Sequence, residues 1–207
     1  MIYDIIRHQN KRNKMKFFKL LSLVMLMAVS INATAEANST SKELPKYMNM
    51  DEFTIKSVDG KSMHLLSTKK GYLFDDGKDK ITLLVLWAGK CKSCVTWLKD
   101  LDAIQKSYPK KLNIVSLEIS NMPLKDIKAF QKKHKISYPM LSAAQNKDFS
   151  SQALIKYQWN RKYKQGLPFT VVFGYQGQTN SITKGVSKKD EYSKYIKNLI
   201  KHYETKK

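Results

Sequence analysis

Two cysteines, Cys91 and Cys94, are the only cysteines in this 207-residue chain, and they mark the junction between a strand and a helix. They follow the apolar run Ile81–Trp87 and precede apolar residues at helical spacing. A cysteine at a helix N-terminus meets unpaired backbone N–H groups and the positive end of the helix dipole, which favour the thiolate. The second sulfur lies within reach of the first, so the pair can open and close as a disulfide. The pattern therefore predicts a strand–helix unit that carries thiol–disulfide exchange.

The same pair has two other interpretations, a structural disulfide and half of a zinc site. A bridge between residues three apart closes a very small loop, which stabilises little in the chain-entropy model. A zinc site needs two further ligands at metal spacing. No second cysteine pair exists, and the four histidines are isolated: His8, His64, His134 and His202. We therefore favour the redox interpretation, with no metal and no cofactor.

The first 35 residues have the pattern of a signal peptide with an N-terminal extension. A basic region beginning at Met15 precedes an apolar stretch of about 12 residues, Leu20–Ile31, which is shorter than the roughly 20 residues of a membrane span. Ala33-Thr34-Ala35 matches a signal-peptidase site, so we expect cleavage after Ala35 and a periplasmic or otherwise exported protein. An uncleaved N-terminal membrane anchor is the alternative. Residues 36–50 indicate a flexible lead-in, and residues 51–207 form the expected domain.

The chain is strongly basic, with 38 Lys and Arg against 17 Asp and Glu and a net charge of +21. Nucleic acid is a candidate partner for such a surface. We do not expect it, because the protein is predicted to be exported and Arg161 is the only arginine after the signal. Arginine is the side chain best suited to bidentate contacts with bases and phosphates. The charge indicates a lysine-rich solvated surface or a peripheral contact with an anionic membrane surface. We expect a monomer.

Hydrophobic periodicity divides residues 51–207 into strands and helices. Phe53–Val58, the turn Asp59-Gly60 and Met63–Leu66 predict a hairpin, and Ile81–Trp87 predicts a strand buried on both faces. The other expected strands are Leu112–Ile119, Tyr138–Leu141, Phe169–Phe173 and Thr179–Thr183. The expected helices run from Cys91 to just before Pro109, from Pro123 to about His134, near Ser150–Tyr157, and over Lys188–Tyr203. This order predicts an α/β fold with parallel strands in its first half and an antiparallel pair in its second.

The chain resembles the thioredoxin superfamily, and most of all its exported TlpA-like (ResA/CcmG-type) thiol–disulfide oxidoreductases. The resemblance covers roughly Asp51–Tyr203. It rests on the Asp59-Gly60 hairpin, on Leu86-Trp87-Ala88-Gly89-Lys90-Cys91-Lys92-Ser93-Cys94, and on Gly166-Leu167-Pro168-Phe169-Thr170 before a strand. It implies a thioredoxin-like fold, in which a central mixed β-sheet is flanked by helices on both faces and preceded by an added N-terminal β-hairpin.

The resemblance also implies roles for individual residues. Cys91 would be the attacking thiolate and Cys94 the buried resolving thiol of a redox-active disulfide. Pro168 would be a cis-proline packed against that disulfide, since X–Pro bonds adopt cis at little cost. A cis bond would turn the Leu167 backbone toward the site, where a substrate strand could pair with it; an ordinary proline at a strand start is the alternative. The other residues expected to shape the site are Trp87, Lys90, Lys92 and Ser93.

Four positions depart from the family pattern. Lys90 stands where the family has Trp, and Lys99 stands where it has a helix-kinking Pro. Val85 replaces the buried Asp of thioredoxins proper, and Trp97 replaces the Glu of ResA-type proteins. These carboxylates are thought to assist proton transfer at the buried thiol. Glu118, at the end of a predicted strand, is a candidate replacement acid; a solvated strand end is the alternative.

The resemblance implies a reductase of disulfides in exported proteins, fed by a membrane thiol-electron donor, with roles in cell redox homeostasis and cytochrome c biogenesis. Lys90 and Lys92 should lower the pKa of Cys91 below the free value of about 8.5. Because this stabilises the reduced form, it makes the pair more oxidising. An isomerase-like or oxidant-poised enzyme is therefore one alternative. A thioredoxin-like binding or chaperone module with low turnover is the other, and it fits the missing carboxylates.

Overall fold

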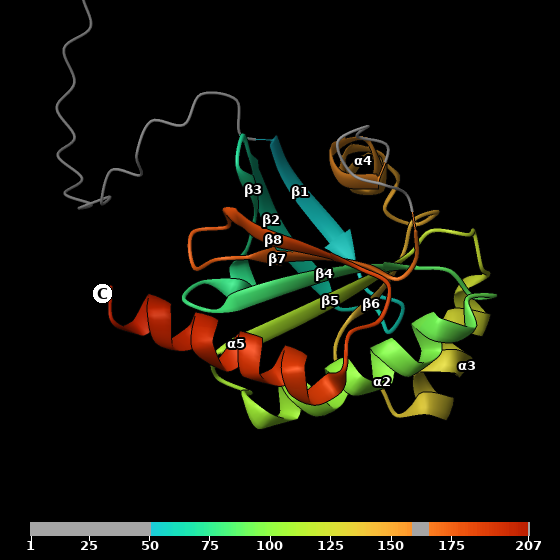
Figure 1. Ribbon diagram of the computed structural model, residues 1–207. Helices are drawn as coiled ribbons and strands as arrows, with labels where there is room; N and C mark the ends of the chain where they lie inside the picture. Colours follow the sequence, from blue (N-terminus) through green and yellow to red (C-terminus); the bar gives the residue numbers. More distant parts are fainter. Residues whose placement is uncertain (1–50, 159–165, 207) are drawn as a thin grey trace, which may run out of the picture. The chain divides into compact units, whose positions relative to one another are not determined.

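The computed structural model describes residues 51–158 and 166–206 (Figure 1). The predicted signal peptide and lead-in lie outside these residues. The strands are β1 (Asp51–Lys56), β2 (Ser62–Thr68), β3 (Gly71–Phe74), β4 (Ile81–Trp87), β5 (Leu112–Glu118), β6 (Met140–Ser142), β7 (Phe169–Phe173) and β8 (Thr179–Lys184). The helices are α2 (Lys92–Ser107), α3 (Leu124–His134), α4 (Lys147–Ala153) and α5 (Lys189–Glu204), with a 3-10 turn η1 (Asp75–Gly77) and a π-helical turn η2 (Leu154–Gln158).

β4 is the middle strand of a five-stranded sheet in the order β6-β5-β4-β7-β8. All seven of its residues are buried, as an uninterrupted apolar run predicts for a strand covered on both faces. β5 runs parallel to β4 and β6 parallel to β5, whereas β7 is antiparallel to β4 and β8 to β7. This confirms the predicted parallel and antiparallel halves. Because β4 and β5 are parallel, their C-terminal ends lie side by side, at the edge of the sheet from which the chain continues to the two cysteines.

A second sheet, β1-β2-β3, contains the predicted hairpin and one strand that the sequence does not predict. β3 has only four residues between two polar turns, too few to show a period. Its start lies against the turn before β8: the Thr179 amide donates to the Lys70 carbonyl at 2.8 Å. A Cβ on Gly71 would lie 2.2 Å from the Gly177 carbonyl oxygen, so only glycine allows this close approach.

The two faces of the five-stranded sheet are covered differently (Figure 1). On one face, α2, α3 and α5 pack against alternate residues of β4 and β5. On the other, the β1-β2-β3 sheet packs together with α4 and η2. Helices on both faces are thus confirmed, with the added hairpin supplying much of the second layer. In residues 51–158 and 166–206 no helix combines the length and apolar character that crossing a bilayer requires.

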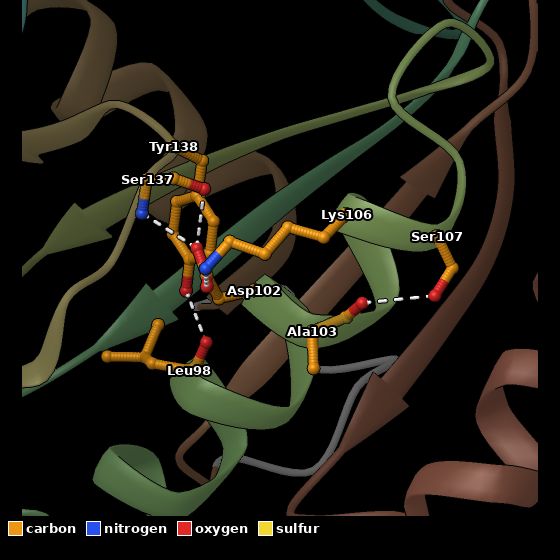
Figure 2. Close-up of polar contacts among 7 residues, drawn as sticks. All are labelled: Leu98, Asp102, Ala103, Lys106, Ser107, Ser137 and Tyr138. Carbon is orange, nitrogen blue, oxygen red and sulfur yellow. Dashed lines mark hydrogen bonds and ion pairs between the residues drawn. The ribbon is translucent and has the colours of Figure 1, made fainter.

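A polar cluster fixes α2 to the chain that leads into β6 (Figure 2). Asp102 is buried on α2, and it accepts hydrogen bonds from the Ser137 amide at 2.7 Å and the Ser137 hydroxyl at 2.6 Å. Lys106 lies 2.5 Å from the other carboxylate oxygen. Burial opposes ionisation of Asp102, but the hydrogen bonds from Lys106 and Ser137 outweigh it and lower its pKa. Beside it, the Tyr138 hydroxyl donates to the Leu98 carbonyl at 2.9 Å. The cluster holds the helix that carries the cysteines.

Candidate active site

The cysteine pair lies where β4 passes into α2. After Trp87 the chain turns, with the Cys91 amide donating to the Ala88 carbonyl at 3.0 Å, and Cys91 becomes the N-cap residue of α2. The two sulfurs form a disulfide of 2.09 Å between α-carbons 5.2 Å apart. The Cys94 amide donates to the Cys91 sulfur at 3.2 Å. The first sulfur therefore receives a helix N-terminal N–H group, which is the arrangement that favours a thiolate after reduction.

The two cysteines differ in exposure. Cys94 is 0% exposed and belongs to the core between the sheet and its helices. Cys91 is partly exposed, and its sulfur lies 3.4 Å from the hydroxyl of the exposed Ser93. An incoming disulfide can therefore reach Cys91, while Cys94 is shielded from it. The two sulfurs therefore differ in how easily an external disulfide can reach them.

Lys90 and Lys92 flank Cys91 and are both exposed. Neither enters an ion pair within the described part of the chain, and the first turn of α2 contains no acidic residue. Their positive charge therefore stays available to an anion at the helix start. Because both side chains are in water, salt should weaken this effect.

The segment that leads into β7 contains the proline that the resemblance assigns to the site. The Leu167–Pro168 peptide bond is cis. Pro168 is buried, and its carbonyl accepts a hydrogen bond from Gly185 at 2.8 Å. Leu167 is partly exposed and packs, like Cys91, against the core cluster that contains Cys94. Val186, next to Gly185, is 44% exposed.

The two positions where the family has carboxylates are filled by apolar packing. Val85 and Trp97 are both 0% exposed and lie in the core cluster with Cys94. The indole N–H of Trp97 donates to the Thr170 hydroxyl at 2.9 Å, and Thr170 is the register partner of Val85. Trp87, beneath the active-site turn, is likewise buried and packs on Phe130 with ring centroids 4.8 Å apart. No acid occupies either family position.

Glu118, the candidate replacement acid, lies near the turn, and the alternative of a solvated strand end is wrong. The residue is 0% exposed at the end of β5. One carboxylate oxygen accepts hydrogen bonds from the amides of Gly89 at 3.3 Å and Ser120 at 2.9 Å, and from the Ser120 hydroxyl. The other oxygen accepts from the Met122 amide at 3.0 Å. A polar residue ending a strand looks exposed in sequence, but here its own following loop folds over it.

Ser120 and Met122 are site residues that the sequence analysis missed. Neither lies near the cysteines in the sequence, and neither belongs to a motif. One signal was present: β4 and β5 are consecutive parallel strands, so the loops after them had to meet at one edge of the sheet. That argument places the residues after Glu118 beside the turn before Cys91.

Comparison with known proteins agrees with this geometry. A family model described as the AhpC/TSA family matches residues 49–181. A curated relative, the thioredoxin-like protein YneN of Bacillus subtilis, is 32% identical over 82 residues, which are 39% of this chain and 48% of YneN. The chain thus matches about half the length of this relative.

Solved structures share the fold. Etrx1, an exposed lipoprotein thioredoxin of Streptococcus pneumoniae, matches with a TM-score of 0.53 and 24% identity over 72% of this chain and all of that one. A secreted Mycobacterium tuberculosis disulfide oxidoreductase matches with a TM-score of 0.52 and 17% identity, covering 71% and 96%. StoA of Bacillus subtilis gives 0.51 and 14%, covering 70% and 96%. At these identities the likeness shows the thioredoxin-like fold.

Proposed function

Because the chain belongs to the AhpC/TSA family, we propose that this thiol–disulfide oxidoreductase of the thioredoxin superfamily works as a reductase of disulfides in exported proteins. The observation that carries the proposal is the asymmetry of the pair. Cys91 is partly exposed at the start of a helix, and Cys94 is fully buried behind it. A structural disulfide has no need of one accessible sulfur, whereas exchange requires it.

The reaction proceeds by two displacements. The Cys91 thiolate attacks one sulfur of the substrate disulfide, forming a mixed disulfide and releasing the other substrate sulfur as a thiolate. The Cys94 thiolate then attacks the Cys91 sulfur, which forms the Cys91–Cys94 disulfide and releases the second substrate thiolate. Two electrons pass from the cysteine pair to the substrate. A dithiol donor returns them by the same steps in reverse.

The substrate is an extended segment that contains a cystine. The partly exposed Leu167 and the cis-proline after it offer a backbone edge beside the pair, where such a segment can add as a strand. Met122, which lies on Gly89, supplies apolar contact, and the exposed Lys90 and Lys92 favour acidic substrates. Haem-attachment cysteines of exported apocytochromes, which must be reduced, are one substrate class of this chemistry.

Export and the electron donor belong to the same proposal. Support for export comes from the signal pattern of residues 1–35 and from the secreted or exposed proteins that share the fold. In an oxidising compartment a reductase must be recharged, so we propose a membrane-bound dithiol as donor. The protein would act as a monomer.

Insulin reduction by dithiothreitol tests the activity. The purified domain should accelerate precipitation of the insulin B chain, and the matched Cys91→Ser variant should not exceed the uncatalysed rate. Equal rates for the two proteins would show a binding module instead of an enzyme.

Trapping tests the roles of the two sulfurs. We expect Cys94→Ala to accumulate mixed disulfides through Cys91, because the resolving thiol is gone. Cys91→Ala should trap little, since Cys94 is buried. Equal trapping by both variants would contradict the role assignment.

An oxidant-poised enzyme is the second candidate, and the exposed Lys90 and Lys92 beside Cys91 favour it. Cationic groups stabilise the thiolate and hence the reduced form, which raises the reduction potential. An oxidant needs a higher reduction potential than a reductase. The equilibrium reduction potential of the Cys91–Cys94 pair therefore separates the two functions.

A further inference from the structure

Glu118 is a buried carboxylate that the exchange steps do not use. It ends β5 and is the register partner of Trp87, the last residue of β4. Side chains of register partners point to the same face of a sheet. Trp87 belongs to the core cluster that contains Cys94, so Glu118 lies on the face of the sheet where the cysteine pair lies.

The carboxylate ties two loops together. The Gly89 amide, two residues before Cys91, donates at 3.3 Å to the carboxylate oxygen that also binds Ser120, and at 3.3 Å to the Ser120 hydroxyl oxygen. The Met122 amide donates to the other oxygen, and the chain bends back toward Glu118 at Asn121, which has a φ of 61°. Asparagine tolerates this left-handed conformation better than most residues. The turn that carries Cys91 is therefore held to the end of β5.

The Met122 side chain makes a second contact with the same turn, by packing on Gly89. A Cβ built on Gly89 would lie 1.9 Å from the terminal methyl group of Met122, so the methionine side chain lies directly on Gly89. The Met122 backbone is itself bound by Glu118. One carboxylate thus fixes Gly89 directly and also through the residue that packs on it.

Among the residues that the structure describes, no cation pairs with the carboxylate of Glu118. All four of its hydrogen-bond partners are donors, the set that an ionised carboxylate accepts. No ion pair in residues 51–158 or 166–206 includes it. Lys90 and Lys92, the two cations that flank Cys91, are exposed. A negative charge beneath the turn disfavours a thiolate at Cys91 and opposes those two lysines.

We propose that Glu118 is a positioning residue of the thiol pair, which anchors the turn before Cys91 and whose buried charge makes the Cys91–Cys94 disulfide harder to reduce. Through this residue the protein keeps a reducing pair despite two lysines beside the attacking sulfur. The inference deepens the proposed reductase function and rests on it for its biological meaning.

The test is the equilibrium of the pair with glutathione. In that equilibrium two glutathione molecules lose two electrons as they form oxidised glutathione, and the protein disulfide becomes two thiols. Glu118→Gln keeps an acceptor oxygen for Gly89 and removes the charge. We expect the equilibrium to move toward the reduced protein by at least about threefold, which is about 14 mV. The shift should persist at high salt, because a buried charge is screened little.

Two further variants separate charge from anchoring. Ser120→Ala removes a hydroxyl that donates to Glu118 and accepts from Gly89. It therefore weakens the anchor but keeps the charge, and it should move the equilibrium by less than about twofold. Glu52→Gln makes the same substitution at an exposed glutamate and should leave it unchanged. A shift in either control as large as that of Glu118→Gln would overturn the electrostatic part of the proposal, as would no shift in Glu118→Gln.

Amide hydrogen exchange tests the anchor in the unaltered protein and does not depend on the variant folding. The Gly89 and Met122 amides should be protected, because both donate to a buried carboxylate; exchange at the rate of free peptide would overturn the anchor. Neither measurement uses a protein substrate. Failure of insulin reduction would therefore refute the reductase and leave the role of Glu118 standing. Conversely, an unshifted glutathione equilibrium in Glu118→Gln would refute the electrostatic role of Glu118 and leave the reductase standing.

Discussion

Two buried carboxylates lie on the helix-covered side of the five-stranded sheet, and they are compensated in different ways. Asp102 on α2 is bound by Ser137 and lies 2.5 Å from the ammonium group of Lys106. Glu118 accepts hydrogen bonds from three backbone amides and one hydroxyl and enters no ion pair in the described ranges. The first neutralises its charge and fastens a helix. Glu118 instead holds the turn that leads to Cys91 and has no cation to neutralise it among the described residues. Burial alone therefore does not tell a structural acid from one that sets the properties of a site.

The largest expected effect is on stability, at Asp102. Asp102→Ala leaves the Ser137 amide without its charged acceptor and removes the ion pair with Lys106, so we expect a loss of about 2–3 kcal/mol of unfolding free energy. Urea denaturation of the oxidised protein measures it. Asp102 lies eight residues after Cys94, about 12 Å along the helix, so the glutathione equilibrium should not change. A change there comparable to that of Glu118→Gln would remove the distinction between the two acids.

The stability of the protein should also depend on pH through Asp102. Its pKa is lowered in the folded state, so ionised Asp102 contributes stability above its unfolded pKa of about 3.9. That contribution is lost as the pH falls through the lower folded value. We expect the difference in unfolding free energy between wild type and Asp102→Asn to shrink as the pH is lowered below about 4. If this free-energy difference instead grew as the pH was lowered, the pKa of Asp102 would be raised in the folded state and not lowered.

The lysines beside Cys91 should have a smaller effect, opposite in sign to that of Glu118. In the reduced wild type we expect a Cys91 pKa below about 7.5, and in Lys90→Ala/Lys92→Ala a rise of about half a pH unit. Alkylation rates against pH measure both. The rise should fade at high salt, in contrast to the shift of Glu118→Gln. A wild-type Cys91 pKa of about 8.5 or higher would show that the two lysines do not stabilise the Cys91 thiolate.

Gly89→Ala should have the smallest effect. The new methyl group meets the flexible end of Met122, which can move aside, so we expect a cost of about 1 kcal/mol in urea denaturation. Because Met122 is also bound to Glu118 through its backbone, exchange at the Met122 amide should become faster. An unchanged exchange rate would show that the methionine packing and the carboxylate act independently.

Local patterns allowed most of the fold to be predicted. The apolar run of β4, the helical spacing after Cys91 and the Asp59-Gly60 turn each depend on neighbours in sequence, and each appears where expected. β3 was missed because four residues carry no periodic signal. The helix expected near Ser150–Tyr157 exists, but it begins at Lys147 and passes into a π-helical turn, a change of winding that periodicity does not resolve.

The parts of the site that belong to a sequence motif could be predicted. The parts that depend on contacts between loops from different strands could not. The cysteine pair and the Leu167–Pro168 segment were identified from spacing and resemblance. The surroundings of Glu118 were not, because Gly89, Ser120 and Met122 come from turns after two different strands. Which loop covers a strand end is decided by tertiary packing, and a single sequence records it only indirectly.

The reduction potential of the Cys91–Cys94 pair in the unaltered protein separates a reductase from an oxidant. A reductase whose buried Glu118 offsets Lys90 and Lys92 should have a potential nearer to the value of about −270 mV of thioredoxin than to the value of about −120 mV of a strong oxidant such as DsbA. Equilibration with glutathione, followed by quantification of the two thiols, gives the number. A potential near about −120 mV would contradict the account, since the pair would then donate disulfides instead of reducing them.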